Sequence, residues 1–341
     1  MKGWLETRQV LERLGALHAN GTRAALATVI RVRGSAYRHE GAKLLVAADE
    51  TIVGNVSGGC LEEDVREVAR RVIRTGVAER QSWCGGHDEI AAWDLGVGCE
   101  GEVELLIEPV TDDRVAERTL IAAEQPFVVL TALDGDHPRR VLTGSDAAQW
   151  FADGASRITE VGGASVFVDV QLPPPRLLVV SGGDDARHLA RLASDVGFRV
   201  VVADRRPGLL TGARFSPPIR LVETDAARIG ERVVLEREDF AVVMTHHFAD
   251  DADYLRALLR SPVRYLGLLG PRSRTERILT ALRAEGPLDE ERIFGPVGLD
   301  IGTDGAEQVA LAVVAELLAV RSGRRPRSLR ERRAPIHHDA E

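Results

Sequence analysis

Cysteine is scarce in this chain of 341 residues. Three residues carry a thiol, Cys60, Cys84 and Cys99, and no two of them form a Cys-x-x-Cys pair. This pattern excludes a disulfide framework and offers no ligand set for a structural zinc site. We therefore expect free thiols.

Long apolar runs and a general excess of basic charge are also missing. No stretch approaches the roughly 18 consecutive apolar residues that a membrane helix needs, and residues 1–8 do not form the apolar core of a signal peptide. A cytoplasmic protein without a membrane span is expected. The net charge of -8 argues against nucleic-acid binding by the body of the chain. Seven arginines lie in residues 321–333, and we expect residues 323–341 to form a solvated, disordered tail.

The length predicts about two domains, at roughly 100 to 200 residues each. A run of three prolines at 173–175 cannot continue a helix or a central strand, and it marks the boundary. The expected domains are residues 1–172 and 173–322.

The first domain is predicted to be mixed α+β. Residues 61–75 have apolar residues at helical spacing, acidic residues in the first turn, arginines in the last turn and Gly76 after it, all of which favour a helix. The remaining clear elements are apolar strands at 24–32, 42–48, 102–107, 126–133 and 165–170.

The second domain alternates strands with helices, which predicts a Rossmann-like, doubly wound parallel sheet. The overall fold class is therefore α/β, with an N-terminal mixed α+β domain followed by the Rossmann-like domain. Strands are expected at 177–181, 198–203, 240–245 and 263–269, and helices at 185–196, 251–260, 273–284 and 305–320.

Gly58, Gly59 and Cys60 directly precede the helix predicted at 61–75. Backbone amides at a helix N-terminus attract anions and favour a thiolate, although the acidic first turn opposes both effects. Cys60 is therefore a candidate nucleophile or metal ligand, and a soft metal would favour ligation. The alternative is a small buried residue in a tight turn.

A loop at residues 33–43 concentrates arginine, histidine and lysine among glycines and a serine. Such loops bind phosphates and other oxyanions, so Gly34, Ser35, Arg38 and Lys43 are candidate binding residues. A solvated hairpin turn is the alternative.

Three further candidates lie next to predicted strands. Cys99 lies in a glycine-rich segment at 96–101, where a ligand can approach the backbone closely. His246 and Arg272 lie at the carboxyl ends of parallel strands, where open α/β sheets bind ligands. Either one could instead cap a helix.

The first strand-to-helix turn of the second domain departs from a dinucleotide fingerprint. Asp204 has the expected spacing, but Ser181 replaces the first glycine, and Asp184 and Asp185 stand where amides should face a pyrophosphate. A carboxylate about 4 Å from a phosphate costs on the order of 4 kcal/mol at an effective dielectric constant near 20, close to a thousandfold in affinity. NAD(P) binding is therefore disfavoured unless the aspartates point away or share a divalent cation with the phosphates.

Together, these motifs resemble the XdhC/CoxI family of molybdenum-hydroxylase maturation proteins, over nearly the whole chain up to about Arg321. The family's Gly-Gly-Cys motif falls on residues 58–60, its Cys-x-Gly motif on 99–101, and its Thr-His pair on Thr245 and His246. The segments that carry the resemblance are GSAYRHEGAKLLV, VSGGCLEEDV, GVGCEG, the triproline linker, VVMTHH, RYLGLLGPRSRTERIL and GLDIG.

The resemblance implies an accessory chaperone more than a catalyst. It implies that the protein binds the molybdenum cofactor (molybdopterin), with Cys60 as a molybdenum ligand, supports sulfuration of the cofactor and inserts it into xanthine dehydrogenase or a related hydroxylase. A cysteine desulfurase is a further partner, and a homo-oligomer is expected. An NAD(P)-dependent oxidoreductase and an assembly scaffold without bound cofactor stay open as alternatives.

Overall fold

The computed structural model describes residues 2–34, 37–84, 102–134, 139–152 and 154–332. The chain forms two compact units, Lys2–Pro173 and the remainder from Pro174 onward. We call them the first and the second unit.

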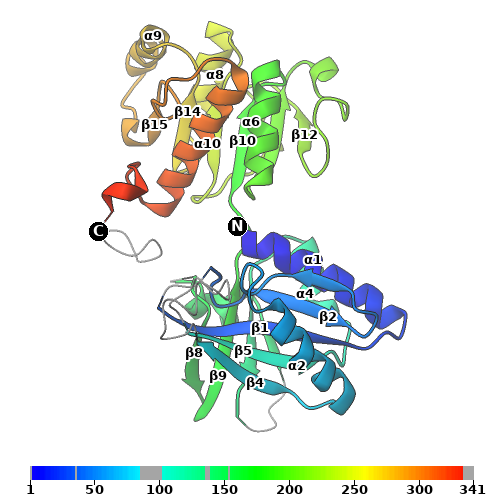
Figure 1. Cartoon of the computed structure of the whole chain (residues 1–341). Helices are drawn as coiled ribbons and strands as arrows, with labels where there is room; N and C mark the ends of the chain where they lie inside the picture. Colours follow the sequence, from blue (N-terminus) through cyan, green and yellow to red (C-terminus); the bar gives the residue numbers. More distant parts are fainter. Residues whose placement is uncertain (1, 35–36, 85–101, 135–138, 153, 333–341) are drawn as a thin grey trace. The chain divides into compact units, whose positions relative to one another are not determined.

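A five-stranded antiparallel sheet organises the first unit, in the order β3-β2-β1-β5-β4. Its central strand β1 is buried over seven consecutive residues because helices cover both faces of the sheet (Figure 1). Helix α2 packs on one face and α1 on the other. The elements are α1 (Lys2–Ala19), β1 (Ala24–Arg33), β2 (Lys43–Ala47), β3 (Ile52–Gly54), α2 (Glu62–Thr75), β4 (Glu79–Cys84) and β5 (Glu102–Pro109).

Helix α2 shows how local sequence sets this architecture. Val65, Val68 and Val72 are buried against the sheet, as the helical spacing predicts. Gly76 ends the helix in the left-handed conformation, and its amide donates a hydrogen bond to the carbonyl of Val72.

A second, four-stranded antiparallel sheet completes the first unit, in the order β7-β6-β9-β8. Phe127 and Val129 of β6 pack in one hydrophobic cluster with Leu14 of α1, so α1 contributes to a core shared with both sheets. The elements are α4 (Val115–Ala122), β6 (Phe127–Ala132), β7 (Arg140–Leu142), α5 (Gly144–Ala147), a 3-10 turn η1 (Ala148–Trp150), β8 (Arg157–Val161) and β9 (Ala164–Gln171).

The second unit confirms the predicted Rossmann-like fold. Six parallel strands run in the order β12-β11-β10-β13-β14-β15, with α6 and α10 on one face and α7, α8 and α9 on the other (Figure 1). The order reverses between β10 and β13, which is the place where such sheets bind ligands. The strands are β10 (Arg176–Val180), β11 (Arg199–Asp204), β12 (Arg220–Glu223), β13 (Phe240–Val243), β14 (Tyr265–Leu268) and β15 (Ile293–Phe294). The helices are α6 (Asp184–Asp195), α7 (Ile229–Arg232), α8 (Phe248–Leu258), α9 (Arg272–Arg283) and α10 (Ala306–Ser322), with 3-10 turns η2 (Pro207–Leu209), η3 (Glu290–Arg292) and η4 (Leu329–Glu331).

Helix α8 begins three residues earlier than the sequence predicts. His247 is its N-cap residue, and its side chain accepts a hydrogen bond from the amide of Asp250. The cap adds a turn that the apolar periodicity alone does not reveal.

Candidate functional site

Cys60 lies on an exposed turn that leads from β3 into α2, and its thiol is free. Gly58 and Gly59 before it have φ angles of 89° and 121°, which only glycine adopts without strain. The turn therefore presents the thiol to solvent, and the alternative of a buried cysteine is wrong.

Most of the amides in this turn already donate hydrogen bonds inside it. Glu62 accepts from the amide and the hydroxyl of Ser57, and these hydrogen bonds lower its pKa although burial raises it. The other donors are the amides of Val56 to Glu62, Gly58 to Asn55, and Gly59 and Leu61 to the Ser57 hydroxyl. These donors hold the turn in shape and are not directed at an external anion.

The cationic loop reaches the thiol turn through Tyr37. A Cβ atom built on Gly58 would lie 2.8 Å from Cδ1 of Tyr37, so the ring lies directly against the glycine. The side chain of Tyr37 is nevertheless 61% exposed. The structure thus brings together the two candidate regions of the first unit, and Tyr37 is a residue that the sequence reasoning did not single out.

Two of the predicted cationic ligands are engaged inside the first unit. Arg38 is 12% exposed and forms a bidentate ion pair with Glu6 of α1. Lys43 is 8% exposed, and its Nζ lies 2.6 Å from Oδ2 of Asp169, on β9, and donates to the carbonyl of Gly41. Both side chains fix the loop, so neither is free to meet a ligand.

For the remaining candidate residues of the first unit, the structure describes only the backbone and the exposure of Gly34. Gly34 is exposed, with a φ of 76°. Ser35, Cys99 and the side chain of Cys84 lie outside the residues that the structure describes.

The glycine turn of the second unit uses its own amides. The amide of Gly182 donates to Oδ2 of Asp204 at 2.7 Å, and that of Gly183 donates to the hydroxyl of Ser181 at 3.0 Å. A dinucleotide of the usual kind needs these donors for its pyrophosphate and Asp204 for its ribose.

Asp204 is also engaged by Arg206, which donates to both carboxylate oxygens. Burial raises the pKa of Asp204, but the hydrogen bonds from Arg206 and Gly182 outweigh it, and the net shift is downward. Leu209 of η2 packs so closely on Gly182 that an added Cβ would lie 2.7 Å from its Cβ. The turn is thus covered by the chain itself.

Asp184 forms an ion pair with an arginine, and Asp185 lies within hydrogen-bond distance of a histidine. Oδ1 of Asp184 lies 2.8 Å from Arg214, which lowers the pKa of this carboxyl group, and Oδ2 of Asp185 lies 2.9 Å from Nε2 of His246. These contacts reduce the electrostatic repulsion that the sequence predicts between the two carboxylates and a bound pyrophosphate. What disfavours a dinucleotide in this structure is the internal use of the turn's amides and of Asp204.

His246 lies at the reversal of strand order, just after β13, with a φ of 61°. The turn that carries it is held by the fully buried Asp251, which accepts from the amide and hydroxyl of Thr245 and pairs with Arg274. Arg272, the other candidate at this edge, is exposed at the first residue of α9.

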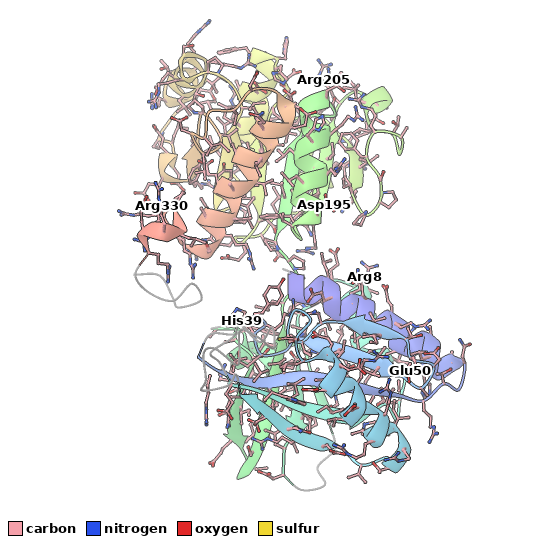
Figure 2. The ribbon with its side chains drawn as sticks, in the orientation of Figure 1. Arg8, His39, Glu50, Asp195, Arg205 and Arg330 are labelled. Atoms are coloured by element: carbon pink, nitrogen blue, oxygen red, sulfur yellow. The ribbon has the colours of Figure 1, made fainter. Side chains whose placement is uncertain are left out.

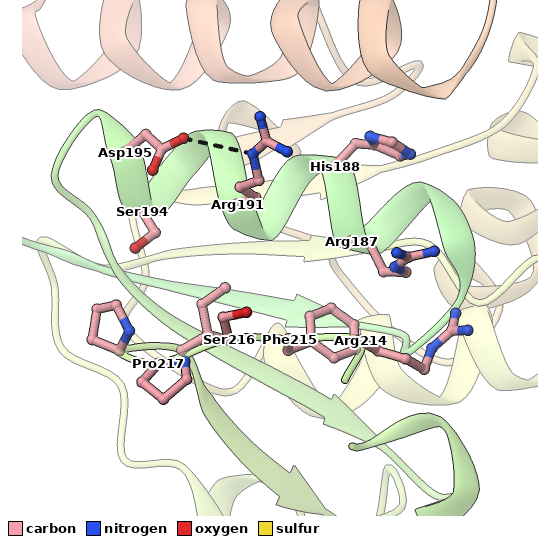
Figure 3. Close-up of a pocket in the computed structure, with 11 residues that line it drawn as sticks. Arg187, His188, Arg191, Ser194, Asp195, Arg214, Phe215, Ser216 and Pro217 are labelled. Atoms are coloured by element: carbon pink, nitrogen blue, oxygen red, sulfur yellow. Dashed lines mark ion pairs between the residues drawn. The ribbon is translucent and has the colours of Figure 1, made fainter. Parts of the chain in front are cut away.

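A groove lies beside α6, between that helix and residues 214–219 (Figure 3). Arg187, Arg191 and Arg214 line it, and each guanidinium has a carboxylate of Asp184 or Asp195 within 4 Å. Asp195 is the last residue of α6, and Figure 2 shows it at the end of this helix that is farther from Arg205. Two carboxylates offset part of the charge of the three arginines, and the arginines are engaged in these ion pairs, so the groove does not identify a ligand.

No group of three or more His, Cys, Asp or Glu side chains in the described ranges is arranged to hold a metal ion. In the same ranges, no helix combines the length and the apolar character needed to cross a bilayer.

Fold and site together define a two-unit protein in which antiparallel sheets carry an exposed thiol turn and a Rossmann-like unit follows. Comparison with known families agrees: the model "XdhC and CoxI family" matches residues 17–83, and the model "XdhC Rossmann domain" matches residues 177–317. The chain belongs to the XdhC/CoxI family.

Individual relatives are similar over most of their length. The chain is 28% identical over 322 residues to a probable xanthine dehydrogenase subunit of Bacillus subtilis, a match that covers 90% of this chain and 96% of the relative. It is 27% identical over 307 residues to the molybdenum cofactor insertion chaperone PaoD of Escherichia coli, with 89% and 85% covered. A solved structure described as a xanthine dehydrogenase from Bacillus halodurans has a TM-score of 0.76 at 29% identity, covering 92% of this chain and 96% of that one.

Proposed function

We propose that this chain is a molybdenum-cofactor chaperone. It binds molybdopterin carrying molybdenum, supports sulfuration of the cofactor and inserts it into a hydroxylase related to xanthine dehydrogenase. The observation that carries the proposal is the exposed thiol of Cys60 on its glycine turn, in a chain similar to PaoD over 89% of its length. A sulfur donor such as a cysteine desulfurase, and assembly into a homo-oligomer, belong to the same proposal.

The chemistry of the turn fits this cargo. A thiolate is a soft ligand suited to molybdenum, and Cys60 is accessible, so a large cofactor can reach it. The amides of the turn and the cations Arg38 and Lys43 are engaged internally, so they preorganise the site and do not supply the anion contacts. His246 and Arg272 are exposed and stay candidate binding residues of the second unit by itself.

The competing oxidoreductase hypothesis is less well supported. Dinucleotide binding at the Rossmann turn would require Asp204 to release both Gly182 and Arg206, and Leu209 to leave the glycine. We therefore propose an accessory role over a catalytic one.

The test is the cofactor content of protein purified from a molybdenum-competent cell. The parent should carry pterin and molybdenum in equal amounts, and Cys60→Ala should lose at least about 90% of both, because the removed thiol is the proposed ligand. Cys84→Ala is the matched control and should equal the parent, while Cys99→Ala should lose less than Cys60→Ala. Equal content in parent and Cys60→Ala would make Cys60 structural, and bound NAD(H) without pterin would favour the oxidoreductase.

A further inference from the structure

Tyr37 has an aromatic ring that the first unit covers only in part. In the described ranges, Tyr37 and Phe248 are the exposed aromatic side chains, at 61% and 38%. The guanidinium of Arg277 covers the ring of Phe248 at 5.2 Å from its centroid. In the same part of the chain, neither a ring nor a guanidinium stacks on Tyr37. Stacking a planar ligand on this ring would contribute about 0.5 to 1.5 kcal/mol beyond the burial of apolar area.

The position of the ring is set by the backbone beneath it. A Cβ on Gly58 would lie within 3.1 Å of three ring atoms of Tyr37, which shows that the absent side chain is what allows the ring to lie there. Gly58 also has a left-handed φ of 89°, so no other residue adopts this conformation without strain.

The loop is fixed on the C-terminal side of Tyr37 as well. Arg38 is paired with Glu6 of α1, and Glu40 accepts a hydrogen bond from the amide of Val32 at 2.9 Å. The ring is therefore held against the thiol turn by contacts that do not depend on a ligand, which lowers the entropy cost of binding to it.

We propose that Tyr37 is a stacking residue for the planar pterin ring of the cofactor. The ring lies against Gly58, and the exposed thiol of Cys60 follows two residues later on the same turn, so an exposed aromatic ring and a soft thiol lie on adjoining segments. Molybdopterin has a planar pterin ring, which matches the aromatic ring of Tyr37. It also carries a metal held through sulfur, which matches the thiol of Cys60. This inference rests on the proposed function and deepens it, because it assigns recognition of the organic ring to a residue other than Cys60.

The test uses the full chain and a pterin without metal, 6-hydroxymethylpterin, followed by the change in pterin fluorescence. Removing a stacked aromatic side chain weakens binding by about 10-fold, so Tyr37→Leu should raise Kd by about that factor. Tyr37→Phe keeps the ring and should stay within about twofold of the parent. Phe248→Leu, the matched exposed aromatic in the second unit, should leave Kd unchanged.

Gly58→Ala adds a methyl group that would displace the ring without removing it and also strains the backbone of the turn, so it should weaken pterin binding at least as much as Tyr37→Leu does. Equal Kd values for the parent and Tyr37→Leu would overturn the assignment of Tyr37. If the parent and Tyr37→Leu also retain molybdenum in the cell while Cys60→Ala does not, the proposed chaperone function stands without a role for Tyr37. Absence of pterin from the parent in both assays would overturn both proposals.

Discussion

The buried pair of Lys43 and Asp169 gives the sharpest test of how the first unit is built. It joins β2 of the five-stranded sheet to β9 of the four-stranded sheet, with side chains 8% and 7% exposed. Gln171 also donates to Asp169, at 2.7 Å. Lys43→Met would remove the cation and leave the carboxylate buried with neutral donors.

Breaking a buried ion pair from one side costs about 3 to 5 kcal/mol. A unit of this size loses about 2 to 4 °C of Tm per kcal/mol, so Lys43→Met should lower the melting temperature of the first unit by about 6 to 20 °C. The double variant Lys43→Met, Asp169→Leu removes both charges and should recover most of the loss, because it leaves no charge buried alone.

Tryptophan fluorescence isolates the first unit in the intact chain. All four tryptophans, Trp4, Trp83, Trp93 and Trp150, precede the triproline run, so the signal does not report on the second unit. Arg8→Met is the control: it breaks an exposed pair with Glu12 and should change stability by less than about 0.5 kcal/mol.

Two results would refute this reasoning. A loss below about 1 kcal/mol for Lys43→Met would show that the pair is not buried in the way described. Reduced pterin affinity at unchanged melting temperature would make Lys43 a ligand, as its place in the cationic loop first suggested.

Three further predictions concern separate features. Asp184→Asn with Asp185→Asn should leave NAD(H) binding undetectable by calorimetry, because the turn's amides stay engaged; tight binding by this variant would restore the repulsion argument. Asp251→Asn should leave Arg274 poorly paired and cost about 3 to 5 kcal/mol, seen as faster hydrogen exchange in α8 and α9 with an unchanged tryptophan signal; full protection in those helices would contradict it. Burial raises the pKa of Glu108 above 4.5, so its stabilising contribution is complete below that value and is lost as pH rises through the folded-state pKa. Glu108→Gln should therefore stabilise the chain near pH 7 and match the parent near pH 4 in urea unfolding, and a pH-independent difference would contradict the assigned shift.

The sequence predicted the elements whose signal is local. Strands such as β10 and β11 are runs of buried apolar residues, and α2 carries its charge pattern and its glycine stop within one segment. Short edge strands such as β7, with three residues, have no such signal, because pairing with a neighbour defines them.

The candidate site was predictable in position and less so in chemistry. The glycines and the thiol of the turn at 58–60 mark a special backbone, and the structure shows them exposed. The state of Arg38 and Lys43 depends on Glu6 and Asp169, which are 32 and 126 residues away in the chain, so counting cations in the loop could not reveal that they are paired. An aromatic residue within a glycine-rich cationic loop was the available signal for Tyr37.

The hydrogen bond from Gly182 to Asp204 has a consequence for how the second unit responds to the cell. Many nucleotide-binding folds gain stability from their coenzyme, so their resistance to unfolding rises and falls with its concentration. In this unit Gly182 and Arg206 of the chain itself engage Asp204, so we expect its stability not to depend on a coenzyme. Its melting temperature should be indifferent to the nicotinamide pool, and the unit would persist unchanged through metabolic states that destabilise an empty dehydrogenase.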